Sequence, residues 1–324
     1  MLRPNLAPRS SVSATARFSP AVNGTLCCVV AALGYGGVNV CLRVLTVRCD
    51  RGLILFAKES LAVACVGAWF AYRARRSGFS LPRWSAAIGL MAVGALTQLA
   101  ATLPLLWAMA VVGLAIPVTV SLGASLVTSA ILGRIMLGEP ITGQSLVAIG
   151  LLIGAVGFLT FGAEAGAAAV PAVQELDRLS LFLVTMVPFV AGIIYGLLSV
   201  SIRRSVTGGV SVGFVAMVIP AMGVICLAPG CFWRLGAGAI LATPPRDLLV
   251  MLLAGLLNVV AWFAFIKGLQ TTRVVHANVL TAAQVAMAAV AGIFLFEEAA
   301  SPALLAGVAM TIAGMVSIDR PASG

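Results

Sequence analysis

Apolar runs of about twenty residues recur along the whole chain, separated by short segments that hold glycine, proline and charged residues. A helix needs roughly 20 apolar residues to cross the hydrocarbon core of a bilayer. Only 9% of the 324 residues are charged and 61% are hydrophobic, so the chain has too few polar side chains to cover a surface in water. Soluble domains carry roughly 25% charged residues. The sequence therefore predicts an all-α integral membrane protein.

Ten segments have the length and composition of a spanning helix. Backbone groups in lipid must bond within the protein, and these runs are too long and too uniform to be barrel strands. The predicted spans are 23–45, 53–72, 85–107, 113–133, 143–162, 181–202, 211–231, 247–268, 274–296 and 301–318. Small residues such as Gly34, Gly150 and Gly157 are expected to let these helices approach closely.

The net charge of +10 is spread over the short connecting segments, a pattern that indicates membrane orientation rather than nucleic-acid binding. With a cytoplasmic N-terminus, most of the basic residues fall on the cytoplasmic side, as the positive-inside rule requires. The cluster from Arg43 to Arg51 is an exception. We therefore expect a multi-pass protein of the inner (plasma) membrane with both termini in the cytoplasm. The basic, serine-containing residues 1–22 fit a cytosolic tail, and an organellar transit peptide has a similar composition.

Metal-ligand and cofactor patterns are not found in the sequence. Most of the seven cysteines lie inside apolar runs without metal-ligand spacing, and His276 is the single histidine. We expect no metal, no cofactor and no enzymatic activity. An intramembrane enzyme usually needs a nucleophile beside a base or a cluster of acids, which these residue types supply poorly.

The two halves of the chain repeat each other at a shift of 160 residues. The shift aligns Tyr35–Arg43 with Tyr195–Arg203, with identical Tyr, Gly, Val and Arg positions, and it places Gln98 on Asn258. Each half then holds five helices, so the second half enters the membrane inverted, an architecture common among transporters. The predicted parts are a tail (1–22), a first repeat (23–162), a linker (163–180), a second repeat (181–318) and a C-terminal tail (319–324).

The end of each half carries a short motif. Leu137-Gly138-Glu139-Pro140-Ile141-Thr142 precedes the glycine-rich helix at 150–157, and Phe296-Glu297-Glu298 precedes Gly307 and Gly314. These motifs, with the Tyr-Gly pair near the start of each half, resemble the EamA-type repeats of the drug/metabolite transporter superfamily. The resemblance covers about 25–160 and 182–318. It implies a ten-helix carrier that moves small organic solutes, often by export, through a cavity between the halves.

Polar side chains at apolar depth usually face a protein interior or a water-filled cavity. Tyr35 and Asn39 lie on one helix face at i and i+4, and Tyr195 and Ser199 repeat that face in the second half. Walls of a common cavity and interhelical hydrogen bonds that hold the bundle together both fit this pattern. The candidate cavity residues are Tyr35, Asn39, Gln98, Thr102, Tyr195, Ser199, Asn258, Trp262, Asn278 and Gln284.

Glu59 is the only carboxylate in the interior of a predicted span, since the other acids lie in loops or at helix ends. A carboxylate at this depth can couple transport to protons, or it can reach interfacial water, because it lies within two turns of the helix start. The preceding Lys58 is expected to point elsewhere, since i and i+1 do not share a helix face. Glu139 is expected to cap the helix that follows it.

The sequence thus predicts a secondary transporter for a small organic metabolite, amino acid-like or otherwise polar, working by alternating access and expected to export. Its partners would be the solute, the lipid bilayer and, as a candidate coupling ion, the proton; nucleic acid is not among them. A lipid-handling or structural membrane protein and an intramembrane enzyme are the alternatives. Substrate and oligomeric state stay open.

Overall fold

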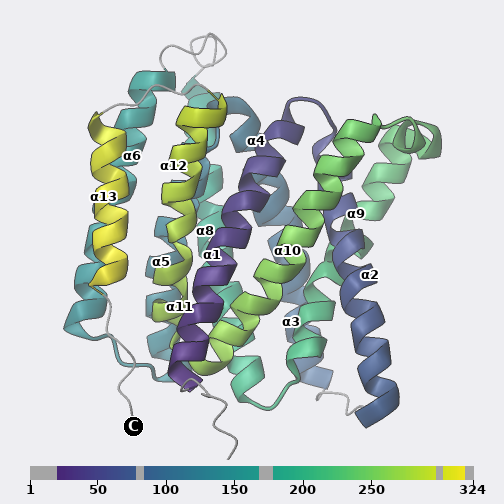
Figure 1. Cartoon of the computed structure of the whole chain (residues 1–324), viewed down its shortest axis with the longest axis horizontal. Helices are drawn as coiled ribbons and strands as arrows, with labels where there is room; N and C mark the ends of the chain where they lie inside the picture. Colours follow the sequence, from purple (N-terminus) through teal and green to yellow (C-terminus); the bar gives the residue numbers. More distant parts are fainter. Residues whose placement is uncertain (1–19, 78–83, 168–177, 297–301, 318–324) are drawn as a thin grey trace, which may run out of the picture.

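The structure, a computed structural model, describes residues 20–77, 84–167, 178–296 and 302–317, and within these ranges it is a bundle of helices without strands (Figure 1). The predicted tails fall almost wholly outside the described residues, as do Glu297 and Glu298. The helices are α1 (Pro20–Thr46), α2 (Arg51–Ser77), α3 (Trp84–Leu96), the π-helix η1 (Thr97–Thr102), α4 (Leu103–Val112), α5 (Ala115–Leu137), α6 (Gly143–Ala167), α8 (Arg178–Thr207), α9 (Val212–Leu241), α10 (Pro245–Thr271), α11 (Val274–Thr281), α12 (Ala283–Phe296) and α13 (Pro302–Val316).

Eight helical stretches in the described residues are long and apolar enough to cross a membrane. In α6 and α13 the apolar stretches are shorter, Gly143–Ala155 and Leu305–Gly314. Large apolar side chains cover the outside of the bundle: Phe294 is 79% exposed and Trp233 is 92% exposed. Such a surface suits lipid rather than water, so the predicted all-α integral membrane protein is confirmed.

Two predicted spans are not single α-helices. The segment predicted as 85–107 consists of α3, η1 and α4, and it extends to Val112. The Thr102 hydroxyl donates to the Thr97 carbonyl at 3.0 Å, and Pro104, which has no N–H, follows two residues later. Proline removes a helical hydrogen bond, and such π-helical turns often occur at functional sites.

The segment predicted as 274–296 is interrupted at Ala282, between α11 and α12. There Val285 N donates to Ala282 O at 2.9 Å, three residues back instead of four. The Thr281 hydroxyl also lies 3.1 Å from the Ala277 carbonyl, a back-bonding contact that bends helices.

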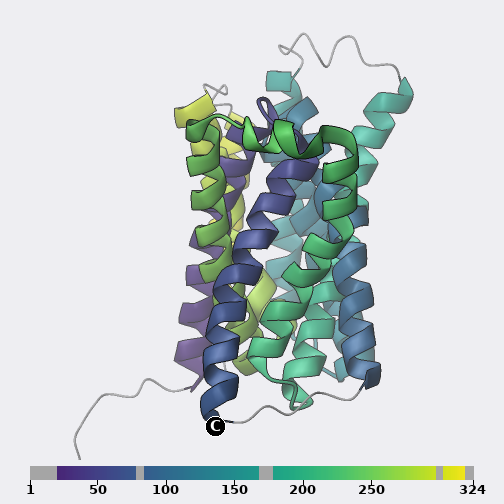
Figure 2. The same ribbon diagram turned by 90° about the vertical axis from the view of Figure 1, so that its right-hand side faces the viewer.

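The closest packing joins helices from opposite halves of the chain. The main pairs are α1 with α10, α5 with α8, α2 with α9 and α6 with α13, and Figures 1 and 2 show α2 running beside α9. Gly34 permits the first pair, because a Cβ added there would lie 2.8 Å from Ala261 Cβ. The expectation for Gly150 and Gly157 is wrong, since an added Cβ would meet nothing within 4 Å at either position.

Candidate functional site

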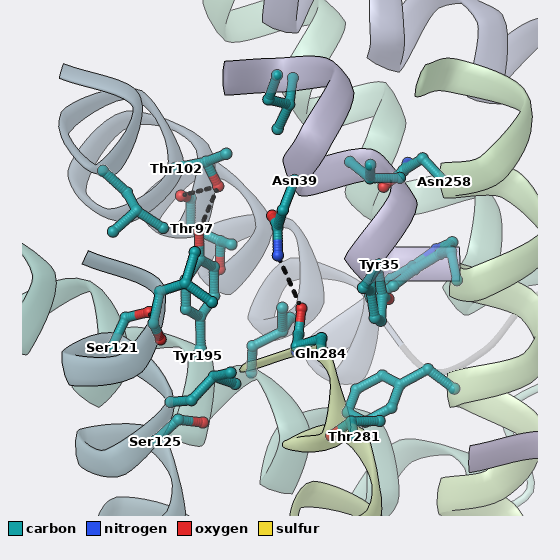
Figure 3. Close-up of a pocket in the computed structure, with 18 of the residues that line it drawn as sticks. Tyr35, Asn39, Thr97, Thr102, Ser121, Ser125, Tyr195, Asn258, Thr281 and Gln284 are labelled. Carbon is teal, nitrogen blue, oxygen red and sulfur yellow. Dashed lines mark hydrogen bonds between the residues drawn. The ribbon is translucent and has the colours of Figure 1, made fainter. Parts of the chain in front are cut away.

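A central cavity of about 190 Å³ lies between the two halves, with walls from α1, α2, η1, α4, α5 and α8 through α12 (Figure 3). A buried water needs only ~10–15 Å³ by a comparable measure, so the cavity has room for several waters or a small solute. All ten candidate cavity residues predicted from the sequence line it, and so do Lys58 and Glu59. Helical spacing predicts that these side chains share helix faces, and in the fold those faces line one cavity.

An amide pair crosses the cavity between the halves. Asn39 Nδ2 on α1 donates to Gln284 Oε1 on α12 at 3.0 Å, although the two residues are 245 positions apart (Figure 3). The other N–H of the Asn39 side-chain amide and both N–H groups of the Gln284 amide take no part in this bond. The pair therefore ties the bundle together and still presents polar groups to the cavity.

Hydroxyl groups make two further contacts at the cavity, and the first of them joins the halves. Tyr195 on α8 donates its phenolic hydrogen to Thr102 Oγ1 on the π-helix at 3.2 Å. One turn along α8, the Ser199 hydroxyl lies 3.3 Å from Asn278 Oδ1 on α11. Trp262 uses its indole N–H elsewhere, donating to the Ala216 carbonyl at 3.2 Å. Its ring is thereby held as a wall of the cavity.

Two cavity amides keep buried atoms without a hydrogen-bond partner in the structure: Gln98 Oε1 and Asn278 Nδ2. Buried polar atoms are nearly always hydrogen-bonded, and an exception calls for an explanation. One acceptor and one donor are thus left over at the cavity wall, where a solute, a water or a newly protonated group can satisfy them.

Lys58 and Glu59 form an ion pair on α2, with 2.7 Å between Lys58 Nζ and Glu59 Oε1. The expectation that Lys58 points elsewhere is wrong, because both side chains are long enough to curl around the helix toward each other. Lys58 Nζ also lies 3.5 Å from Asn258 Oδ1 on α10. Glu59 is 3% exposed, so in this conformation its carboxylate does not reach interfacial water.

Sequence reasoning missed part of the cavity lining. Ser121 and Ser125 on α5 line it, as does Thr97, beside the predicted Gln98. The serines are spaced four residues apart, so their helical spacing was an available signal. Lys58 was missed because adjacent residues were assumed to diverge.

A charged cluster lies where α5 ends and α11 begins. Arg203 Nε on α8 pairs with Glu139 Oε1 at 3.1 Å, and Arg203 Nη1 donates to the Leu269 carbonyl at 2.6 Å. Glu139 Oε2 accepts from Val274 N at 2.9 Å, so it caps α11 in the other half rather than the helix that follows it. That helix, α6, is capped by Thr142, whose Oγ1 accepts from Ser145 N at 3.1 Å.

Comparison with known proteins identifies the second half. Residues 181–318 match the model of the EamA-like transporter family. This half of the chain belongs to the EamA-like transporter family. Among curated proteins, none matches the chain. A solved structure described only as "Crystal structure of protein" is similar in fold, with a TM-score of 0.65 and 16% identity over 91% of this chain and 96% of its own.

The EamA-like half supplies α8 to α12 of the cavity, with Tyr195, Ser199 and Asn258 among its lining residues. The ion pair Lys58–Glu59 comes instead from α2, outside the matched region. The expected resemblance is therefore confirmed on 181–318, and the cavity's charged groups are contributed by the other half.

Proposed function

We propose that the protein is a secondary transporter that carries a small organic solute across a membrane by alternating access. The observation that carries the proposal is the central cavity, lined by polar side chains of both halves inside an apolar bundle. Polar groups at this depth are costly in lipid and are retained where they bind solutes or ions. A carrier needs such a site midway between the two sides.

The proposed halves, 23–162 and 181–318, would be inverted repeats that cross the membrane five times each. Helix packing supports this relation. The contact of α1 with α10 has its counterpart in the contact of α8 with η1 and α4, while α2 and α9 contact each other, as do α6 and α13. A pseudo-two-fold axis through the bundle would produce this pattern. The cavity would then lie on this axis, where rocking of the halves would open it to either side in turn.

Glu59 is the proposed site of proton coupling, since it is buried in the cavity wall and can exist as a carboxylate or as a neutral acid. The distribution of basic residues supports cytoplasmic termini and a place in the inner (plasma) membrane. Export is the proposed direction, by analogy with the EamA-like family.

Counterflow in vesicles tests the carrier function directly. Purified protein in liposomes, loaded with one unlabelled compound of a panel of amino acids, nucleosides, sugars, amines and organic acids, should accumulate the same labelled compound transiently. Protein-free liposomes and a lipid-facing variant, Phe294→Leu, serve as controls. Folded protein that gives no counterflow with any class would overturn the proposal.

A further inference from the structure

The cavity's ion pair points to the chemical class of the solute. We propose that Lys58 is the receptor for the carboxylate of an organic monoacid, which takes the place of Glu59 on the ammonium group while Glu59 takes up a proton. The inference rests on the proposed carrier function and goes beyond it by naming the substrate class and the group that binds it.

The geometry around Lys58 favours an exchange of one carboxylate for another. Its Nζ lies 2.7 Å from Glu59 Oε1 and 3.5 Å from Asn258 Oδ1, and both charged residues face the cavity. The side chains are 9% and 4% exposed, so the pair is almost fully removed from water. A buried ammonium left without an anion is strongly destabilising. A group that displaces Glu59 must therefore bring its own single negative charge.

The structure also places close to Glu59 an amide whose oxygen has no hydrogen-bond partner. A Cβ added at Gly223 would lie 2.7 Å from Glu59 Cγ and 3.1 Å from Gln98 Cδ, so the carboxyl and the amide lie against the same point of α9. Gln98 Oε1 is buried and has no partner. A protonated Glu59 has an O–H to donate, and a carboxylate has none. In the proposed solute-loaded state, this O–H would have an acceptor on the neighbouring Gln98 amide.

The charges and bonds balance in this exchange. The ionic contact between Lys58 and Glu59 breaks, and one between Lys58 and the solute carboxylate forms. One proton from water on the open side forms the O–H bond of Glu59. The cavity has no net charge from this pair before the exchange or after it. The carrier can therefore change conformation, empty or loaded with solute, without exposing an unpaired charge to the hydrocarbon region.

Beside the amides and hydroxyls already described, the cavity offers apolar surface to the body of the solute. Tyr35, Trp262 and Phe265 form an aromatic wall, and Leu105 and Leu106 an aliphatic one. Lys58 and Glu59 are the only charged side chains among the described lining residues. A second carboxylate on the solute would stay unpaired, so the site selects monoacids over diacids.

The pH dependence of this exchange can be assigned to Glu59. Helix α2 packs against α1, α4, α9 and α10. Besides Lys58, the titratable groups that interact electrostatically with Glu59 are the phenols of Tyr35 on α1 and Tyr195 on α8. From α9 and α10 the neighbours are Gly223 and Asn258, which do not titrate. Phenols ionise only in strongly alkaline solution, so in the proposed exchange the proton goes to the Glu59 carboxylate.

Calorimetric titration of the full-length protein in detergent tests the inference with three matched pairs of acid and amide. The probes are benzoate and benzamide, 3-phenylpropanoate and 3-phenylpropanamide, and hexanoate and hexanamide. At least one acid should bind more than about tenfold tighter than its amide, since only the acid can pair with the ammonium. Its affinity should rise about tenfold for each unit fall in pH from 8 to 6, because binding takes up one proton. Buffers of different ionisation enthalpy measure that proton directly.

Three variants separate the roles of the two residues. Glu59→Gln should keep the preference for the acid and lose the pH dependence, because no proton is taken up. The double variant Lys58→Met/Glu59→Gln leaves no unpaired charge and should lose the preference. Lys267→Met, which removes an exposed ammonium outside the cavity, should behave as the wild type. Thermal unfolding checks that each variant is folded. If the Glu59→Gln protein does not fold, the double variant alone tests whether Lys58 binds the carboxylate.

Several results would overturn the assignment of Lys58. The assignment is wrong if the amides bind as tightly as the acids, or if the preference for the acid persists in the double variant. It is also wrong if the affinity of the wild-type protein for the acid does not change with pH. Solute counterflow without any preference for acids would overturn this inference alone and leave the carrier function intact. Absence of counterflow with every class would remove the carrier function itself.

Discussion

Arg43 and Arg203 make the same contact at positions 160 residues apart. Arg43 Nη1 donates to the Met109 carbonyl at 3.1 Å and Arg203 Nη1 to the Leu269 carbonyl at 2.6 Å, and these acceptors are also 160 residues apart. The two guanidinium groups differ at Nε, which pairs with Glu139 in Arg203 and has no partner in the structure in Arg43. The cluster around Arg203 therefore ties the first half to the second at one end of the bundle.

Loss of the Glu139 charge should weaken this tie. Glu139→Gln is expected to lower the free energy of unfolding by about 1–3 kcal/mol, because hydrogen bonds to charged groups contribute in this range. Arg203→Gln should do the same, and the double variant should cost less than the sum of the two because the groups share one interaction. Denaturant unfolding in detergent gives the values. Arg204→Gln, at the exposed neighbouring position, is the matched control and should change stability little.

The amide pair of α1 and α12 allows structural and transport roles to be separated. Asn39→Leu leaves the buried Gln284 amide without its partner and should cost about 1–3 kcal/mol. Asn39→Leu/Gln284→Leu should recover much of that stability, because neither polar group is then left unpaired. We expect both variants to lose solute counterflow. Normal counterflow in the double variant would mean that the pair only holds helices together.

Two further cavity amides give a simpler test. Gln98→Leu and Asn258→Leu are expected to abolish counterflow while the protein stays folded in the membrane, since both side chains line the cavity. Vesicle counterflow and thermal unfolding measure the two properties. Aggregated or uninserted protein would indicate instead that the amides are needed for assembly.

Replacement of Glu59 should uncouple transport from protons. Glu59→Gln keeps the shape and the hydrogen-bonding capacity of the side chain but cannot ionise. It should eliminate solute accumulation driven by a pH gradient and leave downhill counterflow in place. Labelled-solute flux in vesicles, with and without an imposed gradient, measures both. Accumulation that still follows the gradient would show that the proton binds elsewhere.

Helix α8 packs so closely on α5 that adding one methyl group at Gly192 should lower the free energy of unfolding. A Cβ at Gly192 would overlap the Ser121 carbonyl oxygen and lie 2.6 Å from Ala124 Cβ. Gly192→Ala should therefore destabilise the protein by about 1–3 kcal/mol, as overpacking does. Gly89→Ala is the control, because an added Cβ there meets nothing within 4 Å. Alanine's better helix propensity should make that variant neutral or slightly more stable.

Membrane topology can be read with reporter fusions. A reporter fused after Arg76 should give a cytoplasmic signal, and one fused after Ala165 should give the opposite signal. The chain between them holds the stretch from α3 to α4, then α5 and α6, which would cross the membrane three times. Equal signals from the two fusions would contradict the inverted five-helix arrangement.

The sequence by itself determined the class of protein, the approximate course of the helical segments and ten of the polar side chains that line the cavity. The reason is local: lipid requires about 20 apolar residues per span, and a polar residue inside such a run must face the interior. Asn39, Gln98 and Asn258 could therefore be predicted from their depth and helical spacing alone.

Only the tertiary structure decided which polar groups meet. The bond from Asn39 to Gln284, the curl of Lys58 back to Glu59 and the reach of Glu139 to α11 depend on how helices are rotated and on the rotamers of long side chains. The π-helix at Thr97–Thr102 and the break at Ala282 likewise arise where helices meet around the cavity. Apolar periodicity carries no information on these pairings, because many rotations of a nearly uniformly apolar helix bury it equally well.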